Sequence, residues 1–112
     1  MNGEPVRVLV VDDSAFLRYT ISRHLDSDNE ITVVGSARDG AEALEKIALL
    51  VPDVVILDME MPHTDSLSVL EQIMSVRAVP VILLSSPDRQ AAAYTIQGLE
   101  LGAVDFVLKP SA

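Results

Sequence analysis

A length of 112 residues is enough for one domain. Hydrophobic residues make up 49% of the chain and aromatic residues only 4%, which predicts an aliphatic core. The net charge of −9 argues against direct binding to nucleic acid or to an anionic membrane, because both need a basic face. The absence of cysteine excludes disulfides and thiolate metal sites. No apolar run reaches the roughly 18 residues of a membrane helix, and the start MNGEPVRV has no signal-peptide pattern, so we expect a cytoplasmic protein.

Strand-like and helix-like segments alternate along the whole chain. The strand-like segments are short runs of Val, Ile and Leu that end at a polar residue, which is typical of buried parallel strands. The helix-like segments carry apolar residues at helical spacing. We expect strands over 6–11, 31–36, 54–57, 80–84 and 104–108. The first helix is capped by Ser14 with Leu17, Ile21 and Leu25 inward, and the second helix spans 39–49. The third helix has Leu67, Leu70, Ile73 and Met74 on one face, and the fourth is opened by Ser86, Pro87 and Asp88 and ended by Gly102.

This alternation predicts an α/β fold with a doubly wound, five-stranded parallel sheet. Acidic residues follow the first and third strands, and the order 2-1-3-4-5 makes these strands neighbours. Right-handed crossovers place the first helix alone on one face of the sheet and the other three helices on the opposite face. One helix cannot cover strands three to five, so a final helix is missing. We infer that the domain, residues 1–112, is a fragment of a longer protein or that a partner supplies the cover, and we expect the isolated fragment to self-associate or unfold easily.

Three carboxylates and one ammonium group meet in this topology, because the carboxyl ends of parallel strands share one edge. Asp12 and Asp13 follow the first strand, Asp58 follows the third, and Lys109 follows the fifth. Crowded carboxylates repel each other unless a cation lies between them. Oxygen ligands suit Mg²⁺, which takes one or two protein carboxylates and leaves a third as a nucleophile for a phosphoryl group. Lys109 would then pair with the phosphoryl group, and Ser85, at the end of the fourth strand, would offer it a hydroxyl.

Structural roles also explain these residues when each is considered singly. Asp12 and Asp13 are suited to capping a helix. Ser85 is typical of a turn, and Lys109 is typical of a solvated loop. Asp58 is harder to explain in this way, because no helix starts directly after it. The functional interpretation therefore depends on the placement of all these residues at the carboxyl ends of strands.

Four segments of the chain resemble the signature regions of response-regulator receiver domains: VLVVDDSAFLR, DVVILDMEMP, PVILLSS and GAVDFVLKPS. Within this family the chain is most similar to the receiver half of the chemotaxis protein-glutamate methylesterase, on DDSAFLR, the D-x-E-M-P pattern, the paired Ser85 and Ser86, and ELGAVDFVLKPS. The resemblance implies a flavodoxin-like receiver fold, a histidine kinase as phosphodonor and an attached methylesterase domain. The chain itself has no G-x-S-x-G motif or other visible esterase nucleophile, so its own chemistry would be Mg²⁺-dependent phosphorylation and dephosphorylation.

The resemblance assigns the acceptor and the metal ligands. Asp58 matches the phosphoacceptor. Asp13 and Asp58 match the side-chain Mg²⁺ ligands, and Asp12 acts mainly through water. The backbone carbonyl of Glu60 matches the remaining protein ligand.

The resemblance also assigns a switch. Ser85 matches the switch hydroxyl, Phe106 the switch aromatic, and Lys109 the lysine that contacts the phosphoryl group before a cis bond to Pro110. Phosphorylation would draw Ser85 towards the phosphoryl group and turn Phe106 inward. The surface of the fourth helix, the fifth strand and the last helix would then change its partner, which relieves the block on the methylesterase domain.

One departure from the family and three alternatives qualify this interpretation. Ser66 stands where the family usually has glycine, so we expect the loop beside Asp58 to be shifted or less mobile. A haloacid-dehalogenase-like phosphatase also uses an aspartate nucleophile, but in an Asp-x-Asp pattern that Asp12, Asp13 and Ser14 lack. A receiver of another response regulator, such as a transcriptional one, and a pseudo-receiver that never carries phosphate both stay open.

Overall fold

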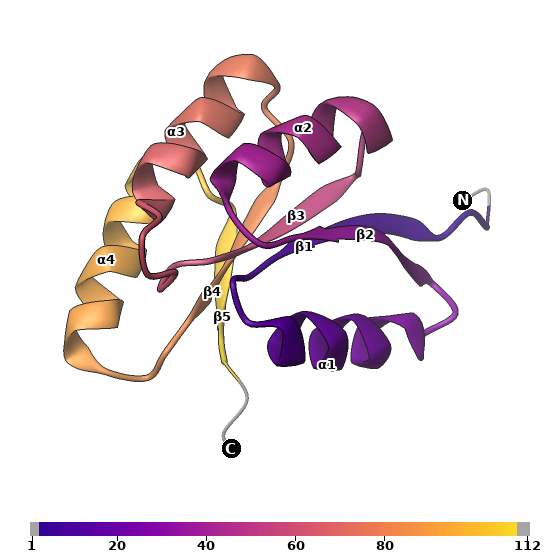
Figure 1. Cartoon of the computed structure of the whole chain (residues 1–112), viewed down its shortest axis with the longest axis horizontal. Helices are drawn as coiled ribbons and strands as arrows, with labels where there is room; N and C mark the ends of the chain where they lie inside the picture. Colours follow the sequence, from indigo (N-terminus) through magenta and orange to yellow (C-terminus); the bar gives the residue numbers. More distant parts are fainter. Residues whose placement is uncertain (1–2, 110–112) are drawn as a thin grey trace.

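Five parallel strands form one sheet in the order β2-β1-β3-β4-β5, which confirms the predicted topology (Figure 1). The computed structural model describes residues 3–109, so the expected cis bond before Pro110 lies outside the described residues. The elements in chain order are β1 (Val6–Val11), α1 (Ala15–Asp26), β2 (Ile31–Ala37), α2 (Gly40–Leu50), β3 (Val54–Asp58), α3 (Ser66–Val76), β4 (Val81–Ser85), α4 (Arg89–Glu100) and β5 (Asp105–Leu108). No helix of this described part is long and apolar enough to cross a membrane.

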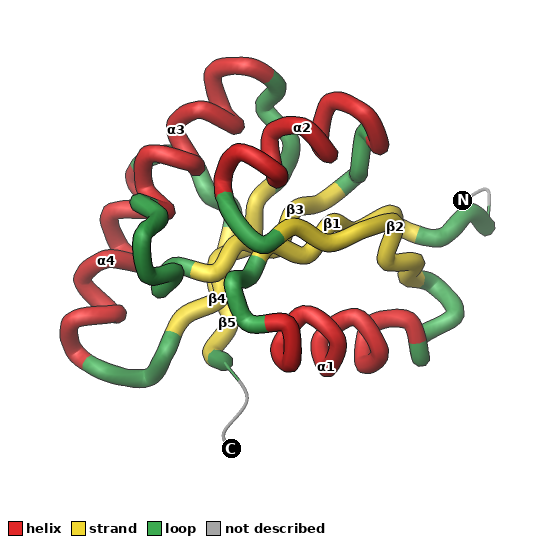
Figure 2. The backbone as a smooth tube through the Cα atoms, viewed as in Figure 1, coloured by secondary structure: helices red, strands yellow, loops and turns green. Residues whose placement is uncertain are grey.

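The main core lies between the sheet and helices α2, α3 and α4, which share one face of the sheet (Figure 2). Leu9 and Val11 of β1, Leu57 of β3 and Leu83 of β4 are fully buried there. Successive side chains of a strand point to opposite faces, so these residues alternate with those that face α1. Helix α1 lies mainly against β1 and β2, and none of its residues is fully buried. One face of the sheet is therefore covered by three helices and the other by α1.

The prediction that residues 104–108 form a buried strand is wrong. Strand β5 begins at Asp105, and all four of its residues are exposed. It is the edge strand of the sheet, at the opposite end from α1 and β2. A hollow of about 280 Å³ between α1 and β5 is lined by Ile21, Leu25 and Leu108, among others. The apolar residues of β5 are exposed because β5 is the edge strand, with the hollow beside α1 on one face and a second hollow beside α4 on the other.

Side-chain caps define where the helices begin. Ser14 accepts a hydrogen bond from the Leu17 N–H at 3.2 Å, as expected for the cap of α1. Helix α4 is capped by Asp88 and begins at Arg89, so Ser86 and Pro87 precede the helix and do not belong to its first turn. Gly102 follows α4 with a φ of +122°, which agrees with its predicted role in ending the helix.

Candidate functional site

The carboxyl ends of β1 and β3 bring three carboxylates together. Asp12, Asp13 and Asp58 each offer an oxygen that lies within 4.8 Å of the other two. Asp12 and Asp58 are 0% and 1% exposed, whereas Asp13 is exposed. Two buried acids thus form the floor of the cluster, and Asp13 forms its solvent-facing side.

Each buried acid has one occupied oxygen and one free oxygen. Asp12 Oδ1 accepts a hydrogen bond from the Ser14 N–H at 2.9 Å, and Asp58 Oδ1 accepts one from the Glu60 N–H at 2.9 Å. The Oδ2 atoms of both acids are buried and have no hydrogen-bond partner within residues 3–109. Buried carboxylate oxygens without partners cost free energy, and a cation between them offsets that cost. The all-oxygen cluster therefore fits a hard metal cation.

Asp12 is the acid whose titration is most affected by this environment. Burial raises the pKa of Asp12 to about 6, and the negative charge of Asp58 adds to the effect. The Ser14 N–H and the positive charge of Lys109 act in the opposite direction but do not outweigh burial. Protons should therefore compete with a metal cation for this carboxylate at pH values around and below about 6.

Lys109 reaches into the cluster from the end of β5. Its Nζ lies 2.9 Å from Asp58 Oδ1 and 3.3 Å from Glu60 Oε1. Burial lowers the pKa of Lys109, but the hydrogen bond to Asp58 and the charges of Asp58 and Glu60 outweigh burial and raise the pKa overall. We expected Lys109 to face a phosphoryl group; in this structure it pairs with two carboxylates.

The carboxylate of Glu60 is a site feature that the sequence did not reveal, since only its backbone carbonyl was expected to act. Glu60 Oε1 accepts a hydrogen bond from the Ser86 N–H at 2.9 Å as well as pairing with Lys109. Burial raises the pKa of Glu60, but the Ser86 hydrogen bond and the Lys109 charge outweigh it and lower the pKa overall. Glu60 therefore joins the β3–α3 loop to the β4–α4 loop.

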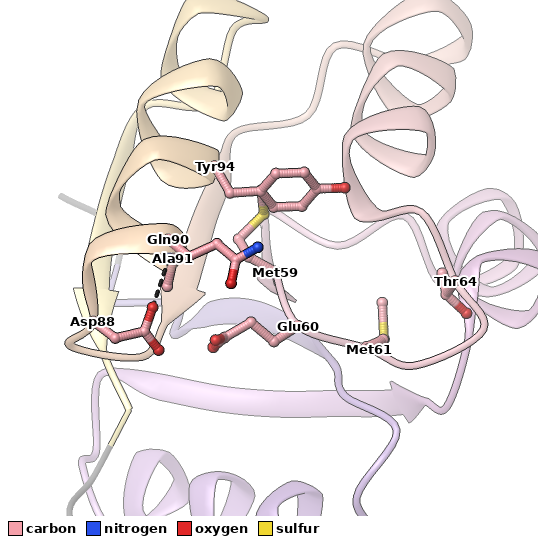
Figure 3. A pocket seen from close by; sticks show the side chains of 8 residues that line it. All are labelled: Met59, Glu60, Met61, Thr64, Asp88, Gln90, Ala91 and Tyr94. Carbon is pink, nitrogen blue, oxygen red and sulfur yellow. Dashed lines mark hydrogen bonds between the residues drawn. The ribbon is translucent and has the colours of Figure 1, made fainter.

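Figure 3 shows Glu60 reaching from the β3–α3 loop towards the start of α4, where Asp88 caps the helix. The pocket between these two segments has a volume of about 330 Å³. Met59 and Met61, which flank Glu60, are buried and belong to the core. On the far wall, the Tyr94 hydroxyl of α4 donates a hydrogen bond to Asp65 Oδ1 at 2.8 Å.

Ser85 and Phe106 lie on the adjacent strands β4 and β5. Ser85 is buried at the end of β4, and its Oγ accepts a hydrogen bond from Thr95 Oγ1 at 2.8 Å. Phe106 is 44% exposed on β5. Both residues line a hollow of about 550 Å³ between β5 and α4. The two predicted switch residues therefore share one cavity.

Ser66 fits its place beside Asp58 without a positive φ, and the expectation of a shifted or less mobile loop stays a prediction. Ser66 is the first residue of α3, and the loop residue with a positive φ is His63, at 66°. The buried Ser66 hydroxyl donates a hydrogen bond to the Asp58 carbonyl oxygen at 2.7 Å. A serine here anchors the backbone of Asp58, which a glycine cannot do.

Comparison with known families agrees with this arrangement. The family model described as the response regulator receiver domain matches residues 8–112. The chain belongs to this receiver-domain family. The resemblance of its four signature segments to receiver domains is thereby confirmed.

Several relatives of this chain are protein-glutamate methylesterases/protein-glutamine glutaminases. The protein-glutamate methylesterase/protein-glutamine glutaminase of Symbiobacterium thermophilum is 57% identical over 107 residues, which cover 96% of this chain and 30% of that protein. The corresponding protein of Pyrococcus abyssi is 48% identical over 112 residues, which cover 100% of this chain and 30% of that protein. The chain thus spans about 30% of the length of these curated relatives.

A solved structure of a related receiver domain has the same fold as this chain. The crystal structure of the response regulator domain of Thermotoga maritima CheB superposes with a TM-score of 0.88 and 46% identity, covering 97% of this chain and 81% of that one. The chain is therefore a receiver domain homologous to the regulatory domain of chemotaxis methylesterases.

Proposed function

We propose that this receiver domain accepts a phosphoryl group on Asp58 from a histidine kinase. The proposal depends on the different contacts of the two carboxylate oxygens of Asp58. Oδ1 is held by Lys109 and by the Glu60 N–H, both at 2.9 Å, while Oδ2 is buried and has no partner among the described residues. One oxygen orients the carboxylate, and the other is available for attack.

In the proposed step, Asp58 Oδ2 forms a bond to phosphorus while the phosphorus–nitrogen bond of a donor phosphohistidine breaks. The imidazole leaves with its electron pair and takes up a proton. Lys109, 2.9 Å from the other oxygen of Asp58, is within reach of a phosphoryl group bound to Oδ2. Its ammonium stabilises the negative charge of the phosphoryl oxygens. Ser85 donates its hydroxyl to one of those oxygens, and Phe106 moves inward behind it.

Mg²⁺ is the proposed metal, with Asp13, Asp58 and the Glu60 carbonyl as its protein ligands and Asp12 bound through water. The unpartnered Oδ2 atom of Asp12 and a cluster made of carboxylates alone support this choice. When bound, Mg²⁺ offsets the repulsion between the carboxylates and the phosphoryl oxygens. This chain superposes on the crystal structure of the CheX–CheY–BeF₃–Mg²⁺ complex from Borrelia burgdorferi with a TM-score of 0.84 and 31% identity. The superposition covers 98% of this chain and 82% of that one. A related fold therefore accommodates both BeF₃ and Mg²⁺.

In the cell, we propose that residues 1–112 act as the receiver domain of a longer cytoplasmic chemotaxis protein. The output domain of that protein would be a protein-glutamate methylesterase. The identity of 57% to such a protein over 96% of the chain supports this output. The exposed strand β5 and the hollow beside α4 offer a surface for the output domain. Phosphorylation of Asp58 would relieve the block on that domain.

Beryllofluoride, which mimics a bound phosphoryl group, tests this proposal. With Mg²⁺ present, its addition should shift the NMR signals of Ser85 and Phe106, and Asp58→Asn should abolish the shifts. Asp28→Asn is the matched control, because Asp28 is an exposed acid in the α1–β2 turn. No shift in the parent protein would favour the pseudo-receiver.

A further inference from the structure

We propose that Thr95 of α4 is a positioning residue that holds the Ser85 hydroxyl in its unphosphorylated position. This inference rests on the proposed roles of Asp58 and Ser85 and adds a residue to them. The sequence indicated no function for Thr95. In the structure, a hydrogen bond from its side chain joins the middle of α4 to the end of β4.

The contact is a buried hydrogen bond between two hydroxyls. Thr95 Oγ1 donates to Ser85 Oγ at 2.8 Å, and the two residues are only 4% and 2% exposed. Ser85 Oγ in turn donates to the Ser86 carbonyl oxygen at 3.3 Å, which is long for a hydroxyl donor. Neither of these partners belongs to the acidic cluster. The Ser85 hydroxyl is therefore attached to α4 rather than to Asp58.

Packing alone does not require a threonine at this position. The buried residues of α4 are Ala91, Thr95 and Gly98. A Cβ at Gly98 would lie 2.6 Å from Leu83 Cδ1, so the helix packs closely against β4. Small apolar residues suffice for such packing, and Thr95 is the polar exception. Its hydroxyl is satisfied by Ser85, which makes the bond a specific link between helix and strand.

The proposed switch changes what Ser85 must do. A hydroxyl has one proton to donate, and phosphoryl oxygens can only accept. Ser85 must therefore give up the long bond to Ser86 when it donates to a phosphoryl group, and its movement stretches the bond from Thr95. Thr95 then has another acceptor, because a helical threonine can donate to the backbone carbonyl three or four residues earlier, here Ala92 or Ala91. The Thr95–Ser85 bond thus stabilises the unphosphorylated state selectively.

Removal of this bond should make switching easier. In the intact protein, titration with beryllofluoride at saturating Mg²⁺, followed by calorimetry, measures the affinity for the phosphoryl mimic. Thr95→Val keeps the shape of the side chain and removes the hydroxyl, so it should bind beryllofluoride about two- to tenfold more tightly, the range expected for one net hydrogen bond. Thr95→Ser keeps the hydroxyl and should retain the parent affinity.

A double-mutant cycle separates this role from a merely structural one. In a Ser85→Ala background, Thr95→Val should leave the beryllofluoride affinity unchanged, because the acceptor of the bond is already absent. An equal gain in that background, or an unchanged or weaker affinity of Thr95→Val in the parent, would overturn the inference. Failure of the parent itself to bind beryllofluoride would instead overturn the proposed function, and this inference with it.

A measurement without a Thr95 variant covers the case in which Thr95→Val does not fold. The Thr95 methyl NMR signal should shift when beryllofluoride binds to the parent, and the shift should become much smaller in Ser85→Ala. An identical shift in both proteins would show that Ser85 does not connect α4 to the site.

Discussion

Strands β3 and β5 end at the same edge of the sheet, but their surroundings differ. The end of β3 is enclosed, with Leu57 and Asp58 almost completely buried. All four residues of β5 are exposed, and Phe106 faces a hollow beside α4. Local stability generally follows such burial, so the β3 side should be the rigid part and the β5 side the part that can rearrange. The proposed chemistry lies in the first region, and the proposed output surface lies in the second.

Polar contacts connect the two regions. Lys109 extends from β5 to Asp58, Glu60 joins the β3–α3 loop to Ser86, and Thr95 joins α4 to Ser85. A change of charge at Asp58 therefore affects groups on β5 and on the β4–α4 loop directly. The following predictions test how strongly the two regions depend on each other.

The largest expected effect comes from loss of the Lys109 charge. Lys109→Met should lower the free energy of unfolding by about 3–5 kcal/mol near pH 7, because it leaves the buried Asp58 carboxylate without its counter-charge. Urea unfolding measures the loss. Arg38→Met is the control, since the Arg38–Asp39 pair is exposed and should contribute at most about 1 kcal/mol. If both variants lost the same small amount, Lys109 would not be coupled to the enclosed region.

Asp12 should give the next largest effect, as a dependence of stability on pH. Its pKa rises from 3.8 in the unfolded chain to about 6 in the fold, so the folded state holds a proton that the unfolded state has lost. Without added Mg²⁺, the contribution of Asp12 should therefore lower stability as pH rises from about 4 to about 6, by on the order of 3 kcal/mol.

Urea unfolding across this pH range, with a chelator present, checks the contribution of Asp12. Asp12→Asn should not show this fall, so the difference in stability between parent and variant should change with pH. Mg²⁺ binds the ionised carboxylates, so its stabilising effect should be larger at pH 7 than at pH 5. Parallel pH profiles for parent and variant would contradict the prediction.

The smallest expected effect is at the exposed strand. Leu108→Ala in β5 should change the free energy of unfolding by about 0.5 kcal/mol or less, because the side chain is largely exposed. Leu57→Ala in β3 is the matched comparison and should cost about 2–5 kcal/mol, since that side chain is fully buried. Equal losses for the two leucines, measured by urea unfolding, would mean that the two regions are equally well packed.

Local residue patterns were sufficient to predict the strand order and the position of the three aspartates. Short apolar runs that end in polar residues identify strands, and parallel strands bring their carboxyl ends together, so Asp12 and Asp58 had to lie near each other. The expected lack of cover over part of the sheet also followed from the sequence, through the handedness of the crossovers. These features depend on neighbouring residues and on topology, which a single sequence contains.

The partners of individual polar groups depended on the folded chain. The Glu60 carboxylate meets the Ser86 N–H, 26 residues later, and Thr95 meets Ser85 across the interface between α4 and β4. No sequence spacing predicts such pairs, because they depend on how helices pack on the sheet and which rotamers that packing allows. The exposure of β5 on the side of α4 has the same origin: Phe106 lies beside α4 but is 44% exposed, because burial depends on how closely a helix packs over a residue.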